Sequence, residues 1–251
     1  MGLFLSSENG AALIAISVIP FVTFAGYRQG MNKPDFVIFD CDGVLVDSEA
    51  ITTRVLRDDL ANWGLDLKVA EIDALFVGGT MTGVMKTSRA MGATLPDVWL
   101  DHIYELIFAA LGAECKPIPR IELVLDALDA VGIGYAIGSN GPVAKMDVTL
   151  RCCGMLERFS GRIYSAHDCA ASKPAPDVYL KAASEAGIAP ERCVVIEDSA
   201  SGARAGAAAG MAVYGFARGG PRDKLAPHCS VLFDDMTELP MLLGLSGCNN
   251  R

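Results

Sequence analysis

Uninterrupted apolar runs alternate with amphipathic stretches along the chain from Met31 onward. Such runs are typical of strands buried on both faces of a parallel sheet, and the amphipathic stretches between them are typical of crossover helices. The strand candidates are Phe36–Phe39, Tyr135–Ile137, Gly161–Tyr164, Val194–Ile196, Ala212–Phe216 and Val231–Phe233. The helix candidates lie near Ile121–Val131, Val143–Cys153, Asp177–Ala186 and Ala200–Ala209. This pattern predicts an α/β fold with a doubly wound, Rossmann-like parallel sheet.

The interval from Asp47 to Gly134 breaks this alternation. It is much longer than one crossover needs, and most of it has the residue pattern of helices. One helix is expected around Ile51, Val55, Leu60 and Trp63, and two more over Met81–Met91 and Val98–Leu111. We therefore predict a core made of residues 31–47 and 116–251, interrupted by a helical domain over residues 48–115, called the helical insertion below. The insertion follows the first strand at its carboxyl end, where doubly wound sheets bind ligands.

Residues 1–30 have a different composition. No charged residue lies between Glu8 and Arg28, and Leu13–Phe24 is mostly apolar, although Pro20 interrupts it. A membrane-spanning helix needs about 20 apolar residues and a secretory signal begins with positive charge, so neither pattern is complete. We expect an apolar N-terminal extension that the chemistry does not need, or a start-site artefact. A membrane anchor or signal and a packed accessory segment are the alternatives.

Charge and cysteine usage narrow the class of partner. The chain has 21 basic and 30 acidic side chains, a net charge of −9, which argues against nucleic acid and against an anionic membrane surface as partners. Its eight cysteines form no CxxC pair, so reduced thiols in the cytoplasm are the better interpretation. The three histidines have no ligand spacing, so zinc is not expected. The oligomeric state stays open between monomer and homodimer.

Two carboxylates leave the end of the first predicted strand. Asp40 and Asp42 follow Phe36–Phe39, and Gly43 then permits a sharp turn of the backbone. Acidic groups held together repel one another unless a cation offsets them, and Mg²⁺ prefers carboxylate oxygens together with substrate phosphate. The pair therefore indicates a magnesium site. A solvated acidic turn is the alternative.

Three further polar groups follow other predicted strands. Ser139 and Asn140 lie at the start of a helix, Lys173 precedes Pro174, and the second acidic pair, Glu197 and Asp198, follows Val194–Ile196. Taken singly, each has a structural alternative: a helix N-cap for Ser139 and for the acidic pair, and a surface lysine for Lys173. Because the carboxyl ends of parallel strands meet at one edge of a sheet, we expect all of them at one site.

The order of these motifs resembles the haloacid dehalogenase superfamily, over essentially Asp35 to Leu243. The segments that carry the resemblance are Phe39-Asp40-Cys41-Asp42-Gly43, Asp47-Ser48-Glu49, Ser139-Asn140-Gly141-Pro142 with Lys145-Met146, the lysine–proline pair and Glu197-Asp198-Ser199. The position of the insertion is similar to that of the subfamily whose α-helical cap domain follows the first motif. Within this subfamily, the quoted segments are most similar to the corresponding segments of bacterial sugar-phosphate phosphatases.

The resemblance implies a role for each motif. Asp40 would attack phosphorus and form an aspartyl-phosphate, and Asp42 would serve as general acid and then general base. Ser139 and Lys173 would hold phosphoryl oxygens. The Mg²⁺ cofactor would be bound by Asp40, by Asp198 with Glu197, and by the backbone carbonyl of Asp42. The second acid, Asp42, argues against dehalogenation, because a leaving halide needs no proton.

The expected substrate is a small phosphorylated metabolite, a sugar phosphate or a phosphorylated sugar acid such as 6-phosphogluconate. A hexose-phosphate mutase of the β-phosphoglucomutase type is the enzymatic alternative. That mutase carries a histidine at the position of Thr52 and an arginine after its Gly-x-Ser loop, where this chain has Gly78-Gly79-Thr80 followed by Met81, so hydrolysis is favoured. A non-catalytic binding module is a remote alternative, because no motif is broken. Candidate substrate-binding residues are Asn140, Arg54, Thr80 and Lys86.

Overall fold

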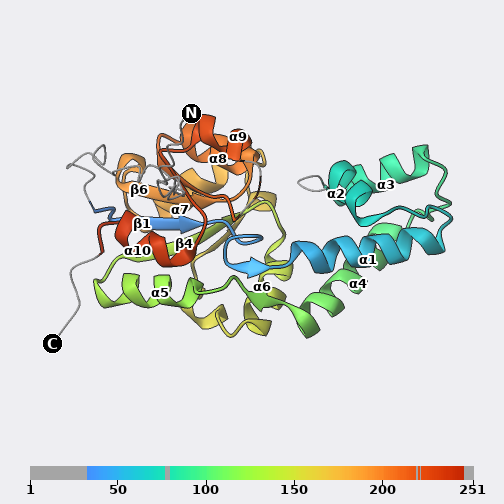
Figure 1. Ribbon diagram of the computed structural model, residues 1–251, viewed down its shortest axis with the longest axis horizontal. Coiled ribbons are helices and arrows are strands. Elements are labelled where there is room, and N and C mark those ends of the chain that lie inside the picture. Colours follow the sequence, from blue (N-terminus) through green and yellow to red (C-terminus); the bar gives the residue numbers. More distant parts are fainter. Residues whose placement is uncertain (1–32, 77–79, 219, 221, 246–251) are drawn as a thin grey trace, which may run out of the picture. The chain divides into compact units, whose positions relative to one another are not determined.

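The computed structural model describes residues 33–76, 80–218, 220 and 222–245 (Figure 1). The interpretation of residues 1–30 and the Gly78-Gly79 part of the predicted loop lie outside the described residues. Within the described ranges, no helix combines the length and the apolar character that crossing a bilayer requires.

A six-stranded sheet forms the centre of the fold, with the strand order β5-β4-β1-β6-β7-β8. Every neighbouring pair is parallel. The strands are β1 (Phe36–Phe39), β4 (Gly134–Ser139), β5 (Ile163–Ser165), β6 (Cys193–Glu197), β7 (Ala212–Phe216) and β8 (Val231–Phe233). The first strand lies in the middle and the order reverses on either side of it, so the predicted doubly wound α/β fold is confirmed.

Helices cover both faces of this sheet, because alternate residues of each central strand point to opposite sides. In β1, Val37 and Phe39 belong to one buried cluster, with side chains of α5, α6 and α10, whereas Phe36 and Ile38 belong to a second, with side chains of α7 and α8. The helices are α5 (Ile121–Ala130), α6 (Val143–Cys152), α7 (Asp177–Ala186), α8 (Ala200–Ala208), α9 (Arg222–Leu225) and α10 (Leu239–Leu242). Short 3₁₀ helices cover Leu156–Phe159, Ala166–Asp168, Pro190–Arg192, Ala226–His228 and Met236–Glu238.

Two helix ends follow local sequence rules. Ser199 caps α8, because its side chain accepts a hydrogen bond from the backbone N–H of Gly202. Helix α7 ends at Gly187, which has a φ of +68°, a conformation that glycine adopts without strain. Helix α8 also packs closely on the sheet, since a Cβ atom at Gly206 would lie 2.7 Å from Val213. These local rules place the first turn of α8 directly after the end of β6.

The helical insertion leaves and re-enters the core through two paired segments. Strand β2 (Val46–Asp47) pairs antiparallel with β3 (Lys116–Pro117), so both connections lie side by side. Between them lie α1 (Glu49–Asn62), α2 (Val69–Phe76), α3 (Met81–Ala90) and α4 (Trp99–Glu114), with α1 packed along α4 (Figure 1). A buried carboxylate joins these two helices: Asp59 accepts hydrogen bonds from Trp99 Nε1 at 2.6 Å and lies 3.0 Å from His102 Nε2.

Candidate active site

The turn after β1 brings the first acidic pair to the sheet edge. Gly43 has a φ of +78°, and a Cβ atom added there would lie 1.9 Å from Asp198 Oδ2. Only glycine therefore permits both the left-handed backbone and the close approach of the second acidic pair. The backbone N–H of Asp40 donates to the carbonyl oxygen of Ile196 at 2.9 Å, which ties the end of β1 to the end of β6.

Lys173 lies between two buried carboxylates. Its Nζ atom is 2.6 Å from Asp40 Oδ1 and 2.8 Å from Glu197 Oε1, and its side chain is only 3% exposed. Burial acts to lower the pKa of this ammonium group, but the two carboxylates outweigh it and raise the pKa above the usual value. Lys173 is therefore held as a cation, with two of its three N–H donors committed to carboxylates.

Glu197 is surrounded by donors. Oε1 accepts hydrogen bonds from Lys173 and from the hydroxyl of Tyr179 at 2.8 Å, and Oε2 accepts from both the backbone N–H and the hydroxyl of Ser199, at 2.8 and 2.9 Å. Its side chain is fully buried. Each oxygen thus already has two partners, which suits a group that holds Lys173 in place. The assignment of Glu197 as a metal ligand stays a prediction.

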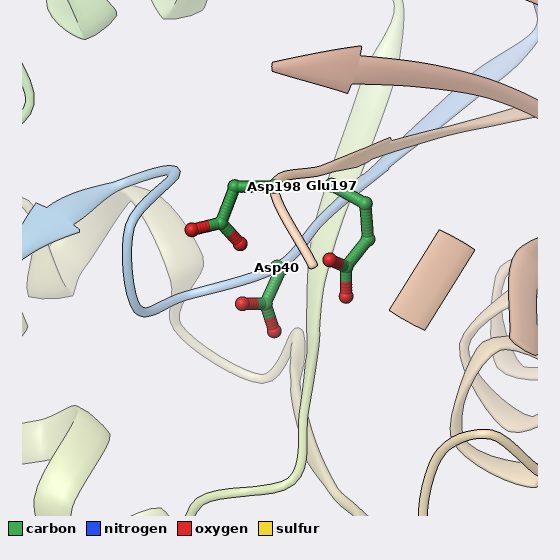
Figure 2. A group of neighbouring side chains, drawn as sticks. All are labelled: Asp40, Glu197 and Asp198. Carbon is green, nitrogen blue, oxygen red and sulfur yellow. The ribbon is translucent and has the colours of Figure 1, made fainter. Parts of the chain in front are cut away.

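Asp40, Glu197 and Asp198 place one carboxylate oxygen each within 4.8 Å of one another. Figure 2 shows these three side chains converging from the ends of β1 and β6. The pKa of Asp40 is raised to about 7, mainly because the carboxyl group is buried. Burial and the charge of Glu197 also raise the pKa of Asp198 well above its usual value. A hard divalent cation fits this set, because it would offset the repulsion and bind the oxygen ligands it prefers.

Asp42 faces different partners from those of Asp40. Its Oδ1 atom accepts a hydrogen bond from Lys145 Nζ at 2.7 Å and another, very short, from the hydroxyl of Ser48. Burial acts to raise the pKa of Asp42, but the charge of Lys145 and these two hydrogen bonds hold it below the usual value. The two carboxylates of the first motif therefore have separate environments, each with its own lysine.

Ser139 is the last residue of β4, and Asn140 follows it, beside the acidic groups. The backbone N–H of Gly141 donates to Ser139 Oγ at 3.0 Å, so the hydroxyl proton of Ser139 is left to donate elsewhere. Asn140 Oδ1 accepts from the backbone N–H of Lys173 at 2.9 Å. Asn140 therefore also fixes the segment that carries the lysine.

The family described as haloacid dehalogenase-like hydrolase matches residues 34–210. The chain belongs to this family. The match spans the four predicted motifs, which confirms the resemblance that their order indicated.

Individual relatives align over most of the chain. The chain is 32% identical over 215 residues to 6-phosphogluconate phosphatase of Escherichia coli (strain K12). This alignment covers 84% of this chain and 96% of the relative. A haloacid dehalogenase-like protein from Agrobacterium tumefaciens is similar in structure, with a TM-score of 0.72, 33% identity and coverage of 84% and 97%. A family hydrolase from Deinococcus radiodurans, solved with bound phosphate and sodium, has a TM-score of 0.71 and 35% identity, with coverage of 85% and 98%. These matches identify the chain as a phosphatase of the haloacid dehalogenase-like family.

A cavity of about 660 Å³ opens over the acidic groups. Its core side includes all six residues predicted to act in catalysis or metal binding: Asp40, Asp42, Ser139, Lys173, Glu197 and Asp198. Its other side comes from the helical insertion and mixes six apolar residues with seven that carry a polar group: Leu56, Ile72, Phe76, Met81, Ile107 and Phe108, together with Ser48, Glu49, Thr52, Thr53, Thr80, Thr82 and Tyr104. The core therefore presents most of the charged groups, and the insertion presents a wall of apolar and hydroxyl-bearing side chains.

The predicted substrate contacts are only partly brought to this cavity. Asn140 and Thr80 line it, and Thr80 also caps α3 by accepting from the backbone N–H of Gly83. Arg54 and Lys86 do not belong to the lining residues, and Arg54 instead pairs with Glu114 at 2.7 Å. The helical periodicity of the sequence indicates which residues of the insertion are on a polar helix face. It does not indicate whether that face points toward the core.

Sequence reasoning did not assign roles to the supporting residues of the site. Lys145 and Ser48 bind Asp42, and Tyr179 and Ser199 bind Glu197. Ser48 and Lys145 lie within segments that carried the family resemblance, and Ser199 directly follows the second acidic pair, so their proximity in the chain was an available signal. Tyr179 had none, since it resembles any buried aromatic residue of an amphipathic helix.

Proposed function

We propose that the protein is a magnesium-dependent phosphatase that hydrolyses a small phosphorylated sugar or sugar acid through an aspartyl-phosphate on Asp40. The observation that carries this proposal is the arrangement around Asp40: a buried carboxylate beside the Lys173 cation, within ligand distance of Asp198 and open to the cavity. A carboxylate in this position can attack phosphorus while neighbouring positive charge offsets the charge of the phosphoryl group.

In the first step, an oxygen of Asp40 attacks phosphorus and the ester bond to the leaving oxygen breaks. The N–H donor of Lys173 that no carboxylate occupies and the free hydroxyl proton of Ser139 can bind phosphoryl oxygens. Asp42, which first has to take up a proton because Lys145 and Ser48 favour its charged form, gives this proton to the leaving oxygen as general acid. In the second step, Asp42 takes a proton from a water molecule, which attacks the aspartyl-phosphate and releases inorganic phosphate.

Asp40, Asp198 and the backbone carbonyl of Asp42 would hold the magnesium ion. The carboxylates of Asp40 and Asp198 are the strongest candidates, because both oxygens of Glu197 already accept two hydrogen bonds. When bound, Mg²⁺ would reduce the repulsion between the nucleophile and the phosphoryl oxygens. The raised pKa values of Asp40 and Asp198 support such an ion, because a nearby cation would stabilise both carboxylates in the charged form.

The substrate class rests on the relative and on the cavity. The Escherichia coli relative is named for 6-phosphogluconate, and a cavity of about 660 Å³ suits a small phosphorylated metabolite. Water is favoured as the acceptor over a second sugar phosphate. Thr52 lines the cavity where the mutase carries histidine, and its hydroxyl donates to the backbone oxygen of Ser48 at 3.0 Å.

A phosphate-release screen over phosphorylated sugars and sugar acids tests the proposal. With Mg²⁺, we expect release from at least one member without any bisphosphate primer, no release in excess chelator, and inhibition by Ca²⁺, whose larger and looser shell misplaces the reactants. Borohydride treatment of the acid-quenched reaction should convert the aspartyl-phosphate at position 40 to homoserine. Full activity in chelator would refute the metal. A large yield of glucose 6-phosphate from β-glucose 1-phosphate that depends on glucose 1,6-bisphosphate would favour the mutase.

A further inference from the structure

Lys145 occupies a position that the proposed mechanism does not use. It lies in the first turn of α6, its side chain is 17% exposed, and it lines the cavity together with Lys173. Its Nζ atom is 2.7 Å from Asp42 Oδ1, so it connects the helix after β4 with the turn after β1. Lysines rarely lie so deep without a partner, and this partner is the proposed general acid.

Lys145 and Ser48 approach the same oxygen of Asp42. Both donate to Oδ1, one from the core and the other from the residue directly before α1. Among the hydrogen bonds of the described residues, none uses Oδ2. That second oxygen faces the turn after β4, since a Cβ atom at Gly141 would lie 3.8 Å from it and 3.4 Å from Ser139 Oγ. Two donors on Oδ1 therefore turn Oδ2 toward the part of the cavity that holds Ser139.

We propose that Lys145 is a positioning residue for Asp42, which fixes Oδ1 so that Oδ2 carries the proton to the leaving oxygen. This inference rests on the proposed function. As Asp40 forms its bond to phosphorus, the bond between phosphorus and the leaving oxygen breaks, the electron pair stays on that oxygen, and the proton moves to it from Asp42 Oδ2. The carboxylate left behind keeps the Lys145 ammonium group as its partner. Lys145 thus acts through Asp42 rather than by touching the phosphoryl group.

Esters with different leaving groups distinguish this role from a merely structural one. A good leaving group such as p-nitrophenolate departs without a proton, whereas phenolate needs the general acid much more. Because kcat/KM covers the steps up to departure of the leaving group, it reports the proton transfer of the first step. The probes are therefore p-nitrophenyl phosphate and phenyl phosphate, measured with Mg²⁺ on the full chain.

We expect Lys145→Met to lower kcat/KM by about 10- to 100-fold for phenyl phosphate and by at most about threefold for p-nitrophenyl phosphate. The first loss is smaller than the about 10²- to 10⁴-fold that general acid catalysis as a whole contributes. Lys145→Arg, which keeps the cation, should recover part of the loss for phenyl phosphate. Lys145→Gln provides a second neutral variant should the methionine variant be poorly folded. Lys224→Met, a change of an exposed lysine in α9, is the matched control and should leave both values unchanged.

An equal loss for both esters would overturn the inference, because it would mark a structural role. No loss for phenyl phosphate would overturn it as well, and so would a rise in KM alone, because that would make Lys145 a binding group for the substrate. The proposed function fails separately: it fails if Asp40→Asn hydrolyses p-nitrophenyl phosphate as fast as the wild-type protein does.

Discussion

The two sides of the cavity are built differently. On the core side, charged groups lie at the ends of neighbouring strands, and Asp40, Asp42, Lys173 and Glu197 all have short contacts with oppositely charged or hydroxyl groups. On the side of the helical insertion, apolar and polar residues line the cavity in similar numbers, and one of the polar ones, Thr53, donates to Asp73 of the insertion itself. In the proposed function, the core side would bind and transfer a phosphoryl group, and the insertion would select what is attached to it.

This difference predicts that the core half of the site tolerates substitutions less than the half formed by the insertion. Each buried charge on the core side is stabilised by its oppositely charged or hydrogen-bonded partners, so removing one partner leaves a buried charge without compensation. The apolar part of the insertion's wall depends on total volume and shape, and single substitutions there are partly absorbed by neighbouring side chains. We therefore expect large effects on turnover from the core side and moderate effects on substrate preference from the insertion.

The largest effect is expected for Asp40→Asn. The amide keeps the shape of the side chain but is a poor nucleophile, so kcat should fall by at least about 10⁴-fold, as for other nucleophile deletions. Phosphate release measures the loss, and circular dichroism should show an unchanged fold. Asp223→Asn, an exposed carboxylate in α9, serves as the control with unchanged turnover. Wild-type turnover in Asp40→Asn would remove this residue from the mechanism.

The second acidic pair sharpens the comparison within the core. Asp198→Asn should lower activity by about 100-fold at low Mg²⁺ and recover in part at high Mg²⁺, because it removes a proposed metal ligand. Glu197→Gln should instead lower the free energy of unfolding by about 2 kcal/mol, because an amide N–H₂ group replaces an acceptor of the Ser199 or Lys173 hydrogen bonds. Activity titrations with Mg²⁺ and chemical denaturation separate the two. If Glu197→Gln shifted the Mg²⁺ dependence as much as Asp198→Asn, Glu197 would be a metal ligand.

A substitution in the apolar part of the insertion's wall should change substrate preference rather than the chemical step. Phe108→Ala removes a half-buried ring that lines the cavity, and we expect KM for the best substrate of the screen to rise by about tenfold, since lost apolar contact in a pocket is worth about 1–3 kcal/mol. Hydrolysis of p-nitrophenyl phosphate should keep its kcat. Leu106→Ala, an exposed position of the same helix outside the cavity lining, is the matched control. A fall of kcat for both substrates would show that the wall also supports the chemistry.

The smallest effects are expected at Arg54 and Lys86. Neither belongs to the residues that line the cavity, and the pair of Arg54 with Glu114 is exposed, so Arg54→Ala and Lys86→Ala should change kcat/KM by less than about twofold. A loss above tenfold in either variant would mean that the insertion moves during catalysis and brings that side chain to the substrate. The assay is the phosphate release used for the screen.

The sequence predicted most of the core elements because their signals are local. The bounds of β1, β7, β8 and α7 are those expected from the apolar runs and helix ends. Strand β5 begins later than predicted, because Gly161 has a φ of +72° and belongs to the turn before the strand. Helix α2 was not predicted, since it is short and buries only Ile72 and Phe76.

The sequence by itself determined the fold class and the six charged or polar groups that line the core side of the cavity. In a parallel sheet, residues that follow different strands must meet at one edge, so their order along the chain was sufficient. Only the tertiary structure decided which carboxylate each lysine faces, that Glu197 is surrounded by four donors, and that Arg54 turns to Glu114. These contacts depend on distances of a few ångströms between elements far apart in the chain, and no local period or propensity encodes them.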